Sequence, residues 1–175
     1  MHIEFTQADE SHVDAIVTLV NSAYRGDSSK KGWTTEADLL GGQRVDSESI
    51  IAALTRDNST ILIAQDEDDD DKLVGCVHLE QHENKCYLGM LTVDPTLQKK
   101  GIGRMLVQES EAFAQFWDCT QIYMTVISVR KELIAWYEKL GFRNTGEKRP
   151  FPYGDERFGQ PKVDNLEFVI LEKKI

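Results

Sequence analysis

The stretch that decides the fold is LQKKGIGRML, residues 97–106. Two glycines, Gly101 and Gly103, follow a pair of lysines and precede a segment whose apolar residues recur at helical spacing. Glycines leave room for a pyrophosphate to approach the main chain, and the start of the following helix supplies N–H donors and partial positive charge. The stretch therefore predicts an anion-binding turn before a helix, with an ordinary glycine-rich turn as the alternative.

Positive charge gathers around the two glycines. Lys99, Lys100 and Arg104 lie between residues 98 and 104, where there is no acidic residue. The pattern lacks the G-x-x-x-x-G-K-[ST] of a nucleotide P-loop and the third glycine of a dinucleotide fingerprint. We therefore expect a phosphate-bearing ligand that is neither a nucleoside triphosphate nor NAD.

Outward from this turn, strand-like and helix-like segments alternate without a linker or an internal repeat, which predicts an α/β domain. Strands are expected at residues 2–8, 59–66, 72–82, 86–95, 121–129 and 165–173. Helices are expected after a cap at Asp9 or Ser11 and at residues 34–44, 47–56, 101–117 and 131–142, the last ending at Gly141. The loop 149–161 is rich in proline, glycine and aromatic residues and looks too elaborate for a plain turn.

Composition narrows the class of protein. A chain of 175 residues with 41% hydrophobic content suits one domain, here residues 1–175. It has no apolar run of membrane-spanning length and no secretory signal, so we expect a cytoplasmic protein that does not bind a membrane. The three cysteines lack CxxC spacing, which argues against a zinc site or a disulfide framework and favours reduced, mostly buried thiols.

Net charge limits the partners. The formal charge of −10 argues against binding to nucleic acid or to anionic lipid. Six of the acidic residues form the run DEDDDD at residues 66–71, which we interpret as a solvated hairpin loop.

A second motif lies one strand and one helix downstream of the glycine turn. The chain carries Asp94-Pro95, then Gln98-x-x-Gly101-x-Gly103, and later Tyr137-x-x-x-Gly141-Phe142. Together these motifs, within residues 60–145, resemble the GNAT superfamily of N-acyltransferases. The segments WTTEADLLGGQR (33–44) and PFPYGDERFG look like elements of one uncharacterised branch of it.

This resemblance implies a fold and an activity. The fold would be α/β (α+β), with a mixed, mostly antiparallel sheet of six to seven strands and about four helices. The chain would transfer an acetyl group from acetyl-CoA, without a metal, to a primary amine of a small molecule or peptide by direct attack in a ternary complex. It would be a monomer or a homodimer. The alternative is a catalytically silent acyl-CoA-binding sensor or interaction module.

The resemblance also assigns residues to the co-substrate. Those expected to bind acetyl-CoA are Met90, Leu91, Thr92, Val93, Gln98, Lys99, Lys100, Gly101, Ile102, Gly103, Arg104 and Arg130. A main-chain N–H within residues 90–93 would stabilise the oxyanion. Tyr137 would protonate the departing thiolate, because a phenol with an ordinary pKa of about 10 suits a thiolate of comparable basicity. Arg130 stands where many members have Asn, so its partner could be the pantetheine arm, a phosphate or the acceptor.

The acceptor side is less defined. The amine must lose a proton, and Glu80 and His78 share one strand face; we choose Glu80 as the base, although it could instead be a solvated edge carboxylate. The residues expected to line the acceptor site are Tyr24, Arg25, Trp33 and Arg44.

Overall fold

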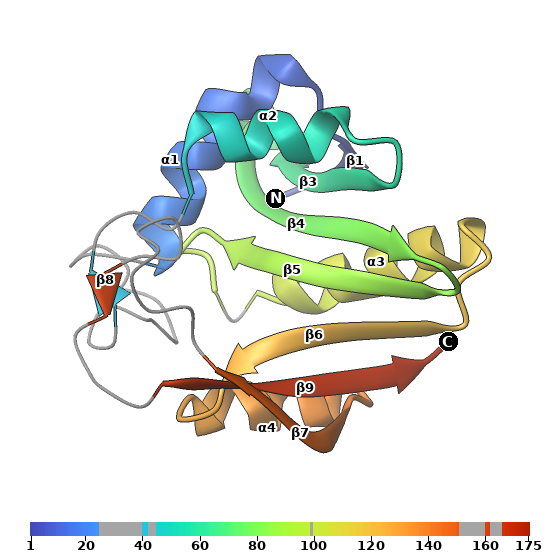
Figure 1. The fold of residues 1–175 in the computed structure, drawn as a ribbon. Coiled ribbons are helices and arrows are strands. Elements are labelled where there is room, and N and C mark those ends of the chain that lie inside the picture. Colours follow the sequence, from blue (N-terminus) through green and yellow to red (C-terminus); the bar gives the residue numbers. More distant parts are fainter. Residues whose placement is uncertain (25–39, 42–44, 99, 151–159, 162–165) are drawn as a thin grey trace.

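One mixed sheet organises the molecule (Figure 1). The computed structural model describes residues 1–24, 40–41, 45–98, 100–150, 160–161 and 166–175. The seven-stranded sheet has the order β1-β3-β4-β5-β6-β9-β7. The strands, in that order, are Ile3–Gln7, Ser59–Asp66, Lys72–His82, Lys85–Val93, Gln121–Ile127, Glu167–Lys174 and Arg143–Pro150. Only the β5–β6 pair is parallel, so the predicted mixed, mostly antiparallel sheet is confirmed.

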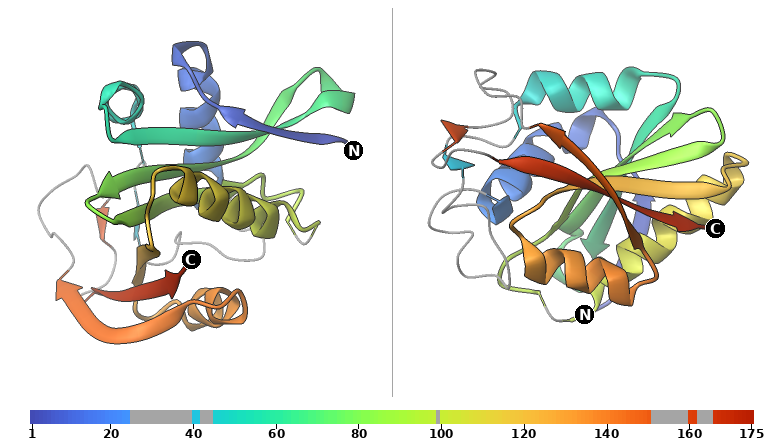
Figure 2. Two further views of the ribbon diagram at one scale, coloured as in Figure 1. Left: turned by 90° about the vertical axis from the view of Figure 1, so that its right-hand side faces the viewer. Right: turned by 60° about the horizontal axis from the view of Figure 1, so that its bottom comes forward.

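Two α-helices cover each face of the sheet. The α-helices are α1 (Val13–Tyr24), α2 (Ser47–Thr55), α3 (Ile102–Phe116) and α4 (Lys131–Lys139), with short 3₁₀ turns η1 (Glu10–His12) and η3 (Glu67–Asp69). The left panel of Figure 2 shows α2 on one side of the sheet and α3 and α4 on the other. Two apolar cores result: α1 and α2 pack over β3 and β4, and α3 and α4 pack over the opposite face.

The sheet opens between its two central parallel strands. β5 and β6 pair at Lys85↔Gln121, Cys86↔Ile122 and Tyr87↔Tyr123, and the ladder ends there although both strands continue. Beyond that point β5 follows β4 and β6 follows β9, so the two halves of the sheet diverge towards the first turns of α3 and α4 (Figure 1). The divergence leaves room for a ligand between two strand ends.

A bulge in β5 lies beside this opening. His78 pairs with Gly89 and Cys76 with Thr92, so Met90 and Leu91 together face one residue of β4. Met90 has a φ of 57°, and its carbonyl accepts a hydrogen bond of 2.8 Å from Thr92 Oγ1. A bulge re-aims the main chain locally, and bulges are frequent next to functional sites.

One predicted helix cap is confirmed. Asp9 forms a capping box at η1, which continues into α1. Asp46, which was not predicted as a cap, forms another capping box at α2. The acidic run 66–71 forms the exposed β3–β4 connection, as predicted.

Three details differ from expectation. The predicted helix at 34–44 lies mostly outside the described residues, and its described part, Leu40–Gly41, forms strand β2, paired with β8 (Gln160–Pro161). β7 was not predicted, because it is almost wholly exposed and polar and so lacks apolar alternation. Phe116, placed by periodicity on the apolar face of α3, is 79% exposed at the end of that helix.

The described part of the chain was searched for membrane-spanning helices and for metal-binding clusters. None of its helices is long and apolar enough to cross a membrane. No group of three or more His, Cys, Asp or Glu side chains in these ranges is placed to hold a metal ion.

Candidate active site

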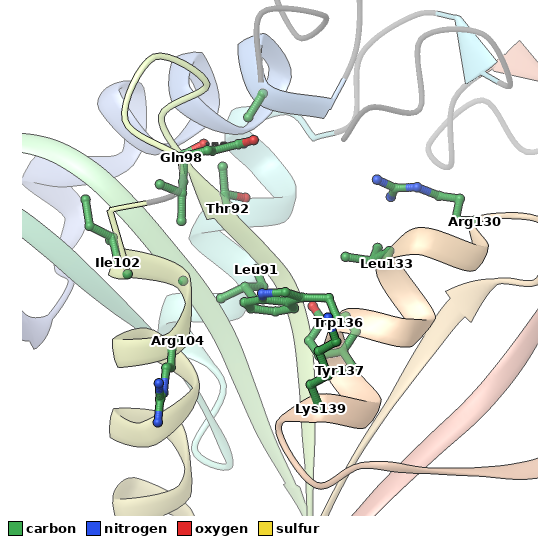
Figure 3. Close-up of a pocket in the computed structure, with 14 residues that line it drawn as sticks. Leu91, Thr92, Gln98, Ile102, Arg104, Arg130, Leu133, Trp136, Tyr137 and Lys139 are labelled. Atoms are coloured by element: carbon green, nitrogen blue, oxygen red, sulfur yellow. Dashed lines mark hydrogen bonds between the residues drawn. The ribbon is translucent and has the colours of Figure 1, made fainter. Parts of the chain in front are cut away.

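A cavity of about 450 Å³ lies where β5 and β6 diverge (Figure 3). Its walls come from the last turn of α1, the end of β5, the loop into α3, the first turn of α3 and one side of α4. The cavity brings together ten of the predicted site residues: Leu91, Thr92, Val93, Gln98, Gly101, Ile102, Gly103, Arg104, Arg130 and Tyr137. Two motifs more than 30 positions apart in the chain thus meet around one space.

Gly101 starts α3 in a conformation that favours glycine. Its φ is 84°, it is the N-cap of the helix, and a Cβ built on it would meet no atom within 4 Å. The Met105 N–H bonds the Gly101 carbonyl at 3.0 Å, which leaves the preceding N–H groups of the first turn without acceptors inside the helix. The first turn carries no acidic residue, so its N–H groups and partial positive charge suit a phosphate.

Gly103 lies in the first turn of α3, facing α4. A Cβ at this position would lie 3.4 Å from the Trp136 ring and 3.6 Å from the side chain of Val93, which are ordinary van der Waals contacts. A methyl group would therefore fit, and only a larger side chain would press on the Trp136 ring. The packing of α3 and α4 does not itself require a glycine here, and the expected reason for it is the access of a phosphate.

Two exposed cationic side chains line the cavity. Arg104 on α3 and Lys139 on α4 line the cavity and are exposed, and they lie at the same end of it in Figure 3. Lys100 is exposed but does not line the cavity, and Lys99 lies outside the described residues. The amide of Gln98 donates to the Val93 carbonyl at 3.2 Å, which holds the loop against the end of β5.

Tyr137 is fixed in the wall of the cavity. It is 5% exposed, and its ring makes edge contacts with Trp136 and Phe142, with centroids 5.0 Å and 5.7 Å away. Gly141, with a φ of 100°, ends α4 and lets the Phe142 N–H bond the Tyr137 carbonyl at 3.1 Å. The glycine and the phenylalanine of the Tyr-x-x-x-Gly-Phe motif therefore hold the tyrosine of the same motif in place.

Glu80 lies outside the cavity lining. It is on β4, opposite Tyr87 of β5. Its carboxylate forms an ion pair with Arg56 Nε at 3.3 Å and accepts a hydrogen bond from Arg56 Nη2 at 3.4 Å. His78 Nε2 is 3.9 Å from the same carboxylate and 2.8 Å from Ser59 Oγ. The sequence correctly placed Glu80 and His78 on one strand face, but the structure gives both of them partners there.

Met90 and the acceptor residues are placed less directly. Met90 packs in the core under α1 and α2 and does not line the cavity. Arg25, Trp33 and Arg44 lie outside the described residues, and only the main chain of Tyr24, the last residue of α1, is described.

Sequence reasoning missed four lining residues: Ala23, Leu133, Trp136 and Lys139. Leu133 and Trp136 stand on the apolar stripe of α4 that contains Tyr137, so the periodicity marked them as buried. Helical periodicity shows which face of α4 is buried. It does not show which part of that face borders a cavity, because this depends on where the strands diverge.

The cavity thus combines a buried tyrosine, a helix start without side chains and a split between two parallel strands. The family of the chain is shown by its sequence: the model of the acetyltransferase (GNAT) family matches residues 13–142, and the chain belongs to this family. No curated protein sequence matches the chain.

Solved structures share the fold at low sequence identity. The ribosomal-protein-S18-alanine N-acetyltransferase of Escherichia coli has a TM-score of 0.72 at 14% identity, covering 99% of this chain and 94% of its own. The ribosomal-protein-alanine N-acetyltransferase of Brucella melitensis has 0.72 at 19%, covering 98% and 99%. The IAA acetyltransferase of Bacillus cereus has 0.69 at 14%, covering 99% and 100%. The acceptors in the names of these proteins differ, so the shared fold does not identify an acceptor for this chain.

Proposed function

We propose that residues 1–175 form one N-acetyltransferase domain that transfers an acetyl group from acetyl-CoA to a primary amine within a ternary complex. The observation that carries the proposal is the meeting, in one cavity, of the bare start of α3 with the buried Tyr137 of α4. The first feature suits an anion and the second suits a proton transfer away from bulk water. Acetyl-CoA joins a pyrophosphate to a thioester through a long neutral arm, so it needs both.

The chain's own groups fit this co-substrate in order. The first-turn N–H groups of α3 and the Arg104 guanidinium would hold the pyrophosphate. The arm would run along the end of β5, between Leu91 and the ring of Trp136. Tyr137 would then lie beside the sulfur.

Each chemical step has a candidate group. The amine nitrogen bonds to the acetyl carbon, the carbon–sulfur bond breaks, and Tyr137 gives its proton to the sulfur. A main-chain N–H of residues 90–93, where the bulge re-aims the strand, would stabilise the negative charge on the carbonyl oxygen. Because Glu80 does not line the cavity, it would take the ammonium proton through water.

The acceptor would enter from the end of α1. Ala23 lines the cavity there, and the Asn21 side chain exchanges two hydrogen bonds of 3.0 Å with the main chain of Val45. These bonds hold Val45 next to α1. On the sequence pattern alone, Tyr24, Arg25, Trp33 and Arg44 remain the residues proposed for the acceptor wall.

An acceptor screen tests the function. Purified protein and acetyl-CoA are incubated with amino acids, polyamines, aminoglycosides and peptide N-termini, and the release of free CoA thiol is measured. We expect micromolar to millimolar KM values for acetyl-CoA and turnover with at least one amine class. Calorimetric binding of acetyl-CoA without thiol release from any amine would instead identify a silent acyl-CoA-binding module.

A further inference from the structure

Thr92 is a buried polar residue in the wall of the cavity, beside the bulge of β5 (Figure 3). It is 2% exposed, and its hydroxyl donates to the Met90 carbonyl at 2.8 Å. A carbonyl only accepts hydrogen bonds, so the hydroxyl hydrogen points at Met90. The bond therefore joins two positions of β5 across the place where this strand carries one residue more than β4.

The bulge has an unfavourable backbone conformation at Met90. Its φ of 57° lies in the left-handed region, which favours glycine and is uncommon for a long side chain. Such a conformation persists only where the surrounding structure holds it, and it is frequent at active sites. The Met90 side chain packs in the core under α1 and α2, and its carbonyl is held by Thr92. The bulge is thus held from both sides of the same residue.

The neighbouring strand restricts the Thr92 side chain in turn. Thr92 pairs with Cys76 of β4. Burial raises the pKa of the Cys76 thiol to about 12, and a hydrogen bond with the Thr92 side chain acts in the opposite direction. The thiol therefore contacts the same side chain that holds the Met90 carbonyl. Because a β-branched side chain is also stiff about its first torsion, Thr92 has little freedom to turn away.

The bulge is the place where the proposed reaction needs its main-chain donor. An N–H group of residues 90–93 would stabilise the oxyanion, and such a donor is effective when it already points at the developing charge. A peptide unit is planar, so a bond that holds its carbonyl holds the whole unit and the path of the strand around it. A displacement of about 1 Å at a reacting centre can cost on the order of 10²-fold in rate.

We propose that Thr92 is a positioning residue for acetyl transfer, because its hydroxyl holds the bulge of β5 in the conformation that aims the oxyanion donor. This inference rests on the proposed acetyl transfer. It gives Thr92 a role different from the contact with acetyl-CoA that the family resemblance implies. Threonine suits the role because its methyl group packs in the wall while its hydroxyl reaches the main chain, whereas valine has the same shape and no donor.

The test is Thr92→Val, which keeps the shape of the side chain and removes the hydroxyl. Wild type and variant are assayed by thiol release with acetyl-CoA and the best amine of the acceptor screen, and acetyl-CoA binding is measured by calorimetry. Loss of a whole oxyanion donor costs about 10²- to 10³-fold in kcat, so a loosened donor should cost about tenfold or more. The Kd for acetyl-CoA and the KM for the amine should change by less than about twofold. Thr92→Ser, which restores the hydroxyl, should recover kcat to within about threefold of the wild type.

The matched control is Ser110→Ala. Ser110 is also buried, and its hydroxyl donates to the Leu106 carbonyl at 2.7 Å, but it does not line the cavity. Its removal should lower the unfolding temperature and leave kcat unchanged. Thermal unfolding checks the folding of each variant, and Thr92→Ala, which adds no new group, decides if Thr92→Val does not fold. If neither variant folds, the hydroxyl serves the fold as a whole and the positioning role is overturned.

The kinetic outcomes separate positioning from binding. Full kcat in a folded Thr92→Val, or an equal loss in Thr92→Ser, overturns the proposal. A raised KM for the amine at unchanged kcat would place the hydroxyl against the acceptor, and weaker acetyl-CoA binding at unchanged kcat would place it against the co-substrate. Either result also overturns the positioning role. If the wild type releases no thiol with any amine, the proposed function itself is contradicted, and this inference with it.

Discussion

The two faces of the central strands carry similar side chains and differ in what surrounds them. On the face covered by α3 and α4, Tyr137 lines a cavity between diverging strands. On the other face, Tyr87 of β5 and Tyr123 of β6 are paired across the two strands, and their ring centroids lie 5.6 Å apart. Burial, and after it the neighbouring Tyr87, raise the pKa of Tyr123, so its hydroxyl stays neutral. The difference teaches that the site depends on where the ladder ends more than on which side chains are present.

The ionisable groups of the second face pair with one another. Arg56 holds Glu80, and Ser59 holds His78, whose ring makes an edge contact with Tyr87 at a centroid distance of 6.1 Å. Of these groups, the sequence analysis singled out Glu80, as the base, and His78 on the same strand face. Four comparisons between the two faces, from the largest expected effect to the smallest, test how the faces differ.

The tyrosines give the largest contrast. Tyr137→Phe keeps the ring packing and removes the proposed acid, so kcat should fall by ~10²- to 10⁴-fold, with a changed alkaline limb and a nearly unchanged affinity for acetyl-CoA. Tyr123→Phe should change kcat by less than about twofold. Both variants are assayed by thiol release and by calorimetry. Full kcat in Tyr137→Phe would make that residue a core aromatic and would remove the contrast.

The glycines come next. Gly103→Val places a branched side chain against the Trp136 ring and at the start of α3, so the Kd for acetyl-CoA should rise by at least about tenfold while the protein still folds. On the other face, a Cβ at Gly89 would lie 2.7 Å from the Tyr87 ring, whose side chain can rotate away. Gly89→Ala should therefore affect acetyl-CoA binding much less. Calorimetry measures both, and equal losses would argue against a phosphate site at the start of α3.

An ion pair on each face allows the contribution of the two faces to the free energy of unfolding to be compared. Lys173 Nζ is 2.6 Å from Glu111 Oε1 and 2.9 Å from the Leu140 carbonyl, so it joins β9 to α3 and to the end of α4. Lys173→Met should lower the free energy of unfolding by about 1–3 kcal/mol, because the partners are mostly shielded from water.

The corresponding change on the other face is Arg56→Met, where the arginine is 44% exposed; the expected loss is about 0–1 kcal/mol. Urea titrations give both values. A larger loss in Arg56→Met would show that the second face is held as tightly as the first.

The smallest effect is expected from the cysteines, which lie in both cores. Burial raises the pKa of Cys76, under α1 and α2, and of Cys86, under α3 and α4, to about 12. Both thiols thus stay protonated well above pH 9, whereas an ordinary thiol ionises near pH 8.5. Alkylation of native protein by iodoacetamide should therefore be slow and should hardly accelerate between pH 7 and pH 9 at these two residues. Peptide mapping measures it, and fast modification of either residue would show that its core opens to solvent.

The free cysteines themselves follow the sequence-based prediction. Cys76, Cys86 and Cys119 are all unpaired by disulfides and buried. The absence of CxxC spacing argued against a zinc site or a disulfide framework and favoured reduced, mostly buried thiols.

The sequence by itself determined the elements whose signals are local. Apolar periodicity, the cap at Asp9 and the glycines at 101 and 141 marked the helices, and apolar runs marked the interior strands. These features depend on contacts within a few residues, so they can be read along the chain. The polar edge strand β7 was not predicted, because its position depends on pairing with β9 and not on a pattern in its own side chains.

Only the tertiary structure decided where the strands part and what each functional side chain faces. The alternation that put Glu80 and His78 on one face could not tell that Arg56 and Ser59 lie there too. The stripe that contains Trp136 and Tyr137 could not tell a cavity from a core. The β5–β6 ladder ends at Tyr87↔Tyr123, and α3 and α4 pack against the same face of the sheet through contacts between residues far apart in the chain. This arrangement has no local sequence pattern, and it brings the glycine turn and the buried tyrosine to one cavity.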